Sequence, residues 1–167
     1  CPMRVFVTGA AGFIGSGVVP ELIRAGHTVT GLARSDANIE TLTRMGASVM
    51  RGSLEDLDSL KRGAAEADGV IHLAFIHDFA KFAENGQIDK RAIEAMGETL
   101  AGTNKPLVVT SGVGLLTPGR LSTEEDAARE GAALPRVSEH AAFAFASRGV
   151  RVSAVRLPQV HGADGKA

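Results

Sequence analysis

The hydrophobic and polar positions of this chain follow two alternating patterns. Short runs rich in β-branched residues recur along the sequence, and longer stretches with an apolar residue at every third or fourth position separate them. This alternation is typical of repeated βαβ units that build a parallel sheet. The apolar runs predict six strands, over residues 4–8, 28–33, 47–51, 69–74, 106–110 and 150–157.

The stretches between these strands predict helices, two of which leave alternatives open. After the first strand, apolar residues recur every four positions from Ile14 to Leu22, as on a helix that buries one face. Pro20 lies inside this pattern and predicts either a kink or a late helix start. Residues 78–102 fit one long helix or two helices interrupted near Asn85. Shorter helices are predicted over residues 36–45, 55–64 and 137–148, and a long surface loop over residues 112–135.

Composition narrows the class of protein. A chain of 167 residues with 44% hydrophobic residues and a formal net charge of −1 suits one α/β domain. Lysines and arginines are scattered, so nothing predicts binding to nucleic acid or to an anionic membrane, and the apolar runs fall far short of the ~20 residues that span a bilayer. The only cysteine is Cys1, which excludes an intrachain disulfide and favours a reducing, cytoplasmic location. Met3 directly precedes the first strand and is the expected native start.

A glycine-rich turn follows the first strand and opens the first helix. Residues 8–15 read Thr-Gly-Ala-Ala-Gly-Phe-Ile-Gly. In such a turn Gly9 permits a tight bend, Gly12 allows the backbone to approach a pyrophosphate, and Gly15 allows close contact between helix and strand. The free N–H groups and the dipole of the helix N-terminus favour an anion at this point. The motif in this context predicts a dinucleotide-binding site.

This motif, followed by Gly26-His27 and a second strand, resembles the extended short-chain dehydrogenases/reductases, and most closely the atypical members of the NAD-dependent epimerase/dehydratase family. Three later segments also match: His72-Leu73-Ala74, Val108-Val109-Thr110-Ser111, and Val155-Arg156-Leu157-Pro158 with His161-Gly162. The resemblance implies a doubly wound Rossmann sheet of about six parallel strands in the order 3-2-1-4-5-6, with helices on both faces. The NAD(P)-binding domain would span residues 3–162, and residues 163–167 would be the truncated start of a substrate region. Homodimers are common in such a family.

The resemblance also implies which residues contact the cofactor. These residues are Gly9, Ala11, Gly12, Phe13, Ile14, Gly15, Arg34, Ser35, Ser53, Leu54, Leu73, Ala74, Phe75 and Thr110. Enzymes that use NAD place Asp or Glu at the end of the second strand, where this chain has Arg34 and Ser35. An arginine fork suits a 2′-phosphate, which favours NADP(H) over NAD(H). The alternative is that Asp36 binds the ribose and Arg34 is a solvated loop residue. Ser53 replaces the aspartate that usually contacts adenine.

The residues that usually perform catalysis in the family are missing. Relatives use a Tyr-x-x-x-Lys pair and a serine or threonine that holds the substrate oxygen. This chain has no tyrosine, and Leu134 and Ser138 occupy the expected slots. Ser111 matches the substrate-orienting serine, although it could instead satisfy loop backbone. Candidate replacement acids or bases are His72, His77, His140 and His161, of which His140 is expected nearest the nicotinamide. No metal site is expected, because His72, His77 and Asp78 bring too few ligands together.

Two functions therefore remain. The first is an NAD(P)-dependent oxidoreductase or epimerase/dehydratase-like enzyme that transfers hydride between NADP(H) and a small carbonyl or alcohol substrate. The second is a catalytically degenerate NADP(H)-binding sensor or interaction protein. Ser111 and the long loop beside the sheet favour the enzyme, but a fold alone cannot choose between them.

Overall fold

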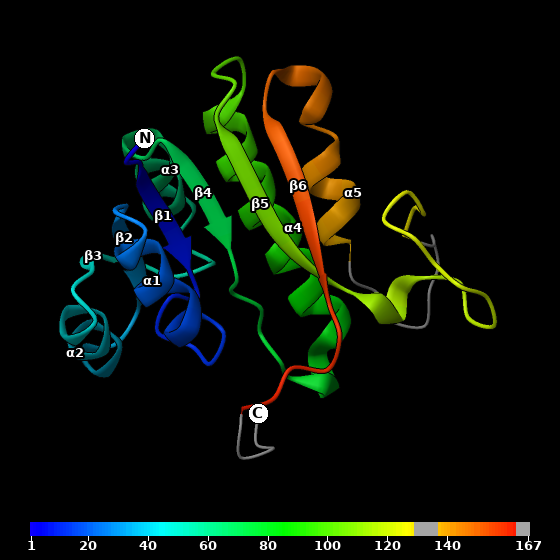
Figure 1. Cartoon of the computed structure of the whole chain (residues 1–167), viewed down its shortest axis with the longest axis horizontal. Coiled ribbons are helices and arrows are strands. Elements are labelled where there is room, and N and C mark those ends of the chain that lie inside the picture. The colour runs from blue at the N-terminus through cyan, green and yellow to red at the C-terminus, as the bar shows by residue number, and fades with distance from the viewer. Residues whose placement is uncertain (129–136, 163–167) are drawn as a thin grey trace.

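The described part of the chain folds into one parallel sheet of six strands, shown in Figure 1. The structure is a computed structural model, and it describes residues 1–128 and 137–162. The strand order is β3-β2-β1-β4-β5-β6, and every neighbouring pair is parallel. The predicted order 3-2-1-4-5-6 is therefore confirmed. The strands are β1 (Arg4–Thr8), β2 (Thr28–Ala33), β3 (Ser48–Arg51), β4 (Gly69–His72), β5 (Pro106–Gly112) and β6 (Arg151–Leu157).

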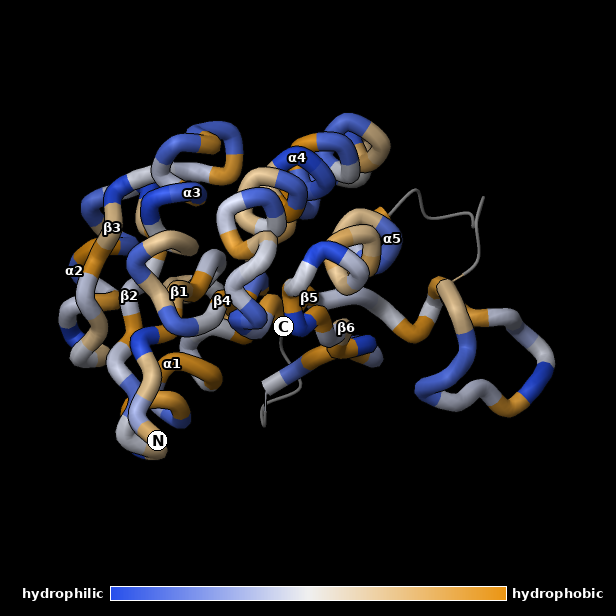
Figure 2. The backbone as a smooth tube through the Cα atoms, turned by 90° about the horizontal axis from the view of Figure 1, so that it is seen from above, coloured by the Kyte–Doolittle hydropathy of each residue, from blue (hydrophilic) through white to orange (hydrophobic). Residues whose placement is uncertain are grey.

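Helices cover the sheet on both faces, as the βαβ pattern predicts. Figure 2 shows α3, α4 and α5 on one face and α1 on the other, with α2 beside the β3 edge. The α-helices are α1 (Gly15–Arg24), α2 (Asp36–Arg44), α3 (Leu57–Glu66), α4 (Phe82–Leu100) and α5 (Ser138–Phe143). Short 3-10 helices are η1 (Phe79–Lys81), η2 (Val113–Leu115) and η3 (Ala146–Arg148). No helix in the described part of the chain is long and apolar enough to cross a membrane.

Two apolar cores lie on the two faces of the sheet. Phe6, Leu60, Ile93, Met96 and Leu107 belong to the larger core, under α3, α4 and α5. The smaller core lies under α1 and α2 and contains residues such as Val7, Val19 and Leu42. Alternate residues of a strand point to opposite faces, so burial on both faces explains the nearly continuous apolar runs of the central strands.

The structure decides where the helices begin and end at the positions where the sequence left alternatives. Residues 82–100 form one continuous helix through Asn85, whose amide donates to the Asp78 carbonyl at 3.2 Å. α1 begins at Gly15 and includes Pro20, so the late helix start is wrong. The predicted helix over 137–148 is shorter, because α5 ends at Phe143 and a 3-10 turn follows. Of the predicted loop, Gly112 belongs to β5, and residues 129–135 lie outside the described part of the chain.

Candidate dinucleotide-binding and active site

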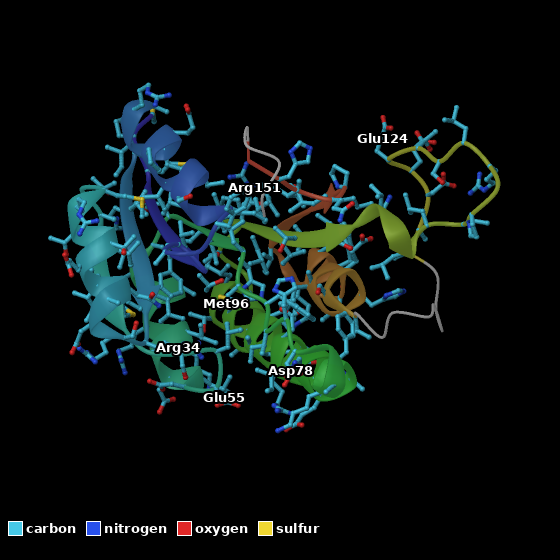
Figure 3. The ribbon with its side chains drawn as sticks, turned by 90° about the horizontal axis from the view of Figure 1, so that it is seen from below. Arg34, Glu55, Asp78, Met96, Glu124 and Arg151 are labelled. Carbon is cyan, nitrogen blue, oxygen red and sulfur yellow. The ribbon has the colours of Figure 1, made fainter. Side chains whose placement is uncertain are left out.

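All six strands end at the same edge of the sheet, because all run parallel. In Figure 1 the strands run from top to bottom, so Figure 3 looks onto their carboxyl ends. Arg34 follows β2 and Asp78 precedes α4, and Figure 3 labels both at this edge. Open α/β sheets bind their ligands outside this edge, where the direction of the winding reverses. Here the reversal lies between β1 and β4.

Two of the three glycines in the turn have no room for a side chain. Gly9 has φ +68°, and a Cβ there would lie 2.7 Å from the backbone nitrogen of Ala74. A Cβ at Gly15 would lie 2.3 Å from the carbonyl oxygen of Ala10. Gly12 is different, because its added Cβ would contact only the Gly9 carbonyl, at 3.2 Å, and the residue is exposed. The turn therefore presents bare backbone outward at Gly12 while Gly9 and Gly15 fix its shape.

This turn fits a dinucleotide pyrophosphate. The N-cap residue of α1, Ile14, makes no side-chain hydrogen bond to the first turn. The N–H groups of Ser16, Gly17 and Val18 already donate to the carbonyls of Gly12 and Ile14, so a phosphate would be bound by the N–H groups just before them in the turn. Phe13, half exposed, and the partly buried Ala11 and Ile14 lie in the same turn. The residues present therefore match the shape and the hydrogen-bonding needs of the group that the sequence predicts.

Arg34 and Asp36 lie in different surroundings at the end of β2. Arg34 is exposed, and no ion-pair partner for it occurs within residues 1–128 and 137–162. Asp36 is the first residue of α2 and pairs with Arg51 at the end of β3. Ser35 caps α2 by accepting a hydrogen bond from the Asn38 N–H at 3.3 Å. The carboxylate of the alternative ribose ligand is thus already paired with an arginine.

The remaining residues of the predicted cofactor set line the ends of β3, β4 and β5. Ser53 accepts a hydrogen bond from the Asp56 N–H at 3.2 Å, and Leu54 packs against the larger core. Leu73 packs against the smaller core. Phe75 contacts the ring of His77 edge-on at 5.3 Å. Thr110 donates to the carbonyl of His72 at 3.1 Å, which ties β5 to β4 below the edge.

A buried chain of hydrogen bonds joins β1, β4, α4 and α5. His72 Nδ1 lies 2.7 Å from Thr8 Oγ1, and His72 Nε2 lies 2.8 Å from Asp89 Oδ1. The other carboxylate oxygen, Asp89 Oδ2, accepts from Ser138 Oγ at 2.5 Å. All four side chains are at most 1% exposed. Thr8 also accepts from the Ala74 N–H at 3.3 Å.

Each donor in this hydrogen-bond network can be matched with an acceptor. Thr8 accepts from Ala74, so its own hydroxyl proton is available to His72 Nδ1. His72 then donates from Nε2 to Asp89, and Ser138 donates to the second oxygen of Asp89. A buried carboxylate is tolerable when donors satisfy it in this way. The network explains His72 as a structural residue that holds the glycine turn to α4 and α5.

Ser111, Glu139 and Arg156 meet at the end of β5. Ser111 is aligned with Arg156 in the β5–β6 register. Arg156 donates two hydrogen bonds to Glu139, with Nε–Oε1 at 2.9 Å and Nη2–Oε2 at 2.8 Å. The Arg156 hydrogen bonds lower the pKa of Glu139, and Ser111 lowers it further, whereas burial opposes the shift. Arg156 and Ser111 therefore both favour the ionised form of the buried Glu139.

The structure does not bring the other histidine candidates to Ser111. His140 is exposed on α5 and lines a groove with residues of α3 and α4, such as Lys61 and Glu94. His77 is exposed beside Phe75, and His161 is exposed with Nδ1 3.0 Å from the Gly162 carbonyl oxygen. Within the described ranges, no group of three His, Cys, Asp or Glu side chains could hold a metal ion.

Leu134 and Ser138 occupy the positions where the family is expected to have its catalytic tyrosine and lysine. Leu134 lies outside the described residues. Ser138 is fully buried and donates to Asp89 in the core, so this position does not direct a side chain at the edge of the sheet.

Sequence reasoning missed Asp89, Glu139 and Arg156. Asp89 and Glu139 are carboxylates among the apolar positions of predicted helices, and each occupies a buried position. A charged residue on the buried face of a helix is rarely unpaired. The sequence therefore indicated that both carboxylates are paired. It did not identify their partners, because these lie 17 to 49 residues away along the chain.

The chain is similar to known proteins of one family. Residues 5–113 match the pattern of the NAD dependent epimerase/dehydratase family. An uncharacterized protein of Schizosaccharomyces pombe is 50% identical over 163 residues, which cover 96% of this chain and 55% of that protein. Dihydroflavonol 4-reductase of Hordeum vulgare is 35% identical over 123 residues, covering 66% of this chain and 35% of that protein.

Solved structures of similar proteins have the same fold. The structure of MoeE5 in complex with UDP-glucose and NAD superposes with a TM-score of 0.76 at 27% identity, covering 98% of this chain and 56% of that one. The chain spans about half the length of the curated relatives that match it over nearly all its residues. UDP-glucose 4-epimerase of Streptomyces lividans is also similar, with 30% identity over 115 residues that cover 67% of this chain and 33% of that protein. This chain belongs to the NAD-dependent epimerase/dehydratase family.

Proposed function

We propose that residues 3–162 form an NADP(H)-binding domain that works in hydride transfer between the dinucleotide and a small carbonyl or alcohol. The observation that carries the proposal is the glycine turn, in which Gly9 and Gly15 have no room for a Cβ and Gly12 presents bare backbone at the start of α1. The bound dinucleotide would supply the hydride chemistry. The protein would bind the pyrophosphate at Gly12 and hold the substrate oxygen with Ser111.

The first test replaces Gly12 by valine. We expect dinucleotide affinity to fall at least about 100-fold, because the side chain fills the space that a phosphate needs. The fold should survive, since an added Cβ meets only the Gly9 carbonyl, at 3.2 Å. Calorimetric titration with NADPH measures the loss. Gly17→Val is the matched control, because a Cβ at Gly17 meets nothing within 4 Å. Undiminished affinity in a folded Gly12→Val protein would remove the pyrophosphate assignment.

The preference for NADP(H) rests on Arg34. Its guanidinium is exposed at the end of β2, whereas the competing ribose ligand Asp36 is paired with Arg51. An arginine that forks onto a 2′-phosphate contributes about 1.5–3 kcal/mol. We propose this role for Arg34.

Arg34→Ala should therefore reduce the ratio of NADPH to NADH affinity by about 10- to 150-fold. Titration of both dinucleotides onto the variant and the parent gives the ratio. Arg44→Ala is the control, because Arg44 is also an exposed arginine and pairs with Glu40 on α2. If the ratio is the same in both variants, Arg34 is a bystander, and Asp36→Ala becomes the informative substitution.

A second candidate function is a dinucleotide-binding sensor without turnover. The absence of tyrosine from the sequence favours it, since the usual proton donor of the family is a tyrosine. Ser111 and its surroundings favour the enzyme. A screen for NADPH oxidation against a panel of small carbonyl compounds separates the two, because only the enzyme consumes the dinucleotide.

A further inference from the structure

The hydrogen bond between Thr8 and His72 lies where the winding of the sheet reverses. These two residues end β1 and β4 and are aligned in the register of the two strands. The chain leaves the sheet here into the glycine turn after Thr8 and into residues 73–75 after His72. Both segments belong to the expected dinucleotide-binding set, and open α/β sheets bind ligands at this point. The contacts of Thr8 and His72 therefore influence how the two segments are spaced.

The two segments are in direct contact. Ala74 donates its N–H to Thr8 Oγ1 at 3.3 Å, and Leu73 donates its N–H to the Thr8 carbonyl at 3.2 Å. Gly9 packs so closely on the same segment that an added Cβ would lie 2.7 Å from the Ala74 nitrogen. The N–H of Gly12 donates to the Gly9 carbonyl at 3.0 Å. The position of the bare backbone at Gly12 thus depends, through Gly9, on the segment after β4.

Two residues of the helical layer hold His72 from behind. Asp89 Oδ1 lies 2.8 Å from His72 Nε2, and Asp89 Oδ2 accepts from Ser138 Oγ at 2.5 Å. Asp89 belongs to α4 and Ser138 to α5, and each is at most 1% exposed. Because these side chains are buried, bulk water cannot replace a hydrogen bond that the network loses. Both ring nitrogens of His72 are engaged, which fixes the orientation of the imidazole against Thr8.

We propose that Asp89 and Ser138 are positioning residues for the dinucleotide, which they influence from behind its expected site. This inference rests on the proposed function. Ser138 occupies the slot where the family is expected to have its lysine, and here it acts on the bound dinucleotide through Asp89, His72 and Thr8. A site that is held in its binding geometry before the ligand arrives binds more tightly, because less conformational freedom is lost on binding. Without the network the glycine turn and residues 73–75 are less firmly placed, so affinity falls although every contacting residue remains.

The first test needs no ligand. Ser138→Ala removes a donor to Asp89 and leaves the glycine turn unchanged, and Asp89→Asn puts an amide in place of the carboxylate. The backbone amide signals of Gly12 and Ala74 are followed in NMR spectra of the full chain. We expect both signals to shift in both variants, because Ala74 donates into the network. If Asp89→Asn does not fold, Ser138→Ala alone decides. Unmoved Gly12 and Ala74 signals in the folded variants overturn the proposal.

Met96→Ala is the matched control for a general loss of packing. Met96 lies on the same helix as Asp89 and is fully buried in the larger core, among apolar side chains. Its truncation should lower the free energy of unfolding and leave the Gly12 and Ala74 signals in place. Signals that move as far in Met96→Ala as in Ser138→Ala would assign the shifts to a looser core and would also overturn the proposal.

The second test is calorimetric titration of the full chain with NADPH and with NADH. For the dinucleotide that the parent binds more tightly, Ser138→Ala and Asp89→Asn should each lower the affinity about 10-fold, and Met96→Ala less than about twofold. Thr8→Val keeps the shape of the side chain without its hydroxyl and should lower the affinity by a similar factor. Adding Ser138→Ala to Thr8→Val should cause no further loss, because members of one hydrogen-bond network do not act additively.

The outcomes distinguish this proposal from the proposed function. If the parent binds a dinucleotide and the variants of Asp89 and Ser138 bind it as tightly, the positioning role is wrong and the proposed function stands. Losses that multiply in the combined variant would show that Thr8 and Ser138 act separately, which also overturns the positioning role. If the parent binds neither dinucleotide, the proposed function fails and the positioning role fails with it.

Discussion

Asp89→Ala should lower the free energy of unfolding by about 3–5 kcal/mol. The substitution removes the acceptor of two buried donors, His72 Nε2 and Ser138 Oγ, and leaves a cavity between α4, α5 and β4. Asp89→Asn should cost less, about 1–2 kcal/mol, because the amide can still accept one of the two hydrogen bonds. Urea denaturation followed by circular dichroism measures all variants.

Glu94→Ala is the control for this prediction. It lies on the same helix and forms only a loose, half-exposed pair with Lys90 at 3.8 Å, so its loss should cost less than about 0.5 kcal/mol. If Asp89→Ala and Glu94→Ala unfold at the same urea concentration, the buried network does not stabilise the fold.

Gly15→Ala should be the most damaging of the glycine substitutions. The added Cβ would lie 2.3 Å from the Ala10 carbonyl oxygen and 2.4 Å from the Gly9 carbonyl oxygen. Backbone atoms cannot rotate away as a flexible side chain can, so the start of α1 must shift. We expect a loss of about 3 kcal/mol in unfolding free energy, together with weaker dinucleotide binding, because the shift moves the turn that holds the pyrophosphate.

Gly17→Ala is the matched control, two residues later on α1. Nothing lies within 4 Å of its added Cβ, and alanine favours a helix over glycine by about 0.8–1.0 kcal/mol. The two substitutions should therefore change stability in opposite directions. A Gly15→Ala protein that is as stable as the parent would show that the turn is looser than the structure indicates.

The alternation of strands and helices was predictable from sequence because each element carries its own pattern. All six predicted strands occur in the structure, and the glycine turn lies where its motif places it, between β1 and α1. The continuous helix through Asn85 was not decidable from sequence, because the sequence does not show that the Asn85 amide donates to the Asp78 carbonyl just before the helix. Local helix propensity alone favours neither one long helix nor two helices interrupted near Asn85.

The polar groups of the site were harder to predict than the fold. Ser111 was identified because it ends a strand in a recognisable segment, and strand ends share one edge. Glu139 and Arg156 were not paired in advance, because their contact depends on the way α5 lies over β6. His140, two residues after Ser138, drew attention as a titratable residue, but the turn of α5 directs it to an outer groove. Helical rotation over one residue separates a buried glutamate from an exposed histidine.

Adjacent residues at the start of α5 bind to different parts of the molecule. Ser138 donates to Asp89 on α4, and Glu139 accepts from Arg156 on β6. A helix of six residues would fray rapidly in isolation. Any opening of its first turn would break both attachments together. We therefore expect the amide protons of this turn to exchange about as slowly as those of the core strands, rather than at the rate of a fluctuating terminus.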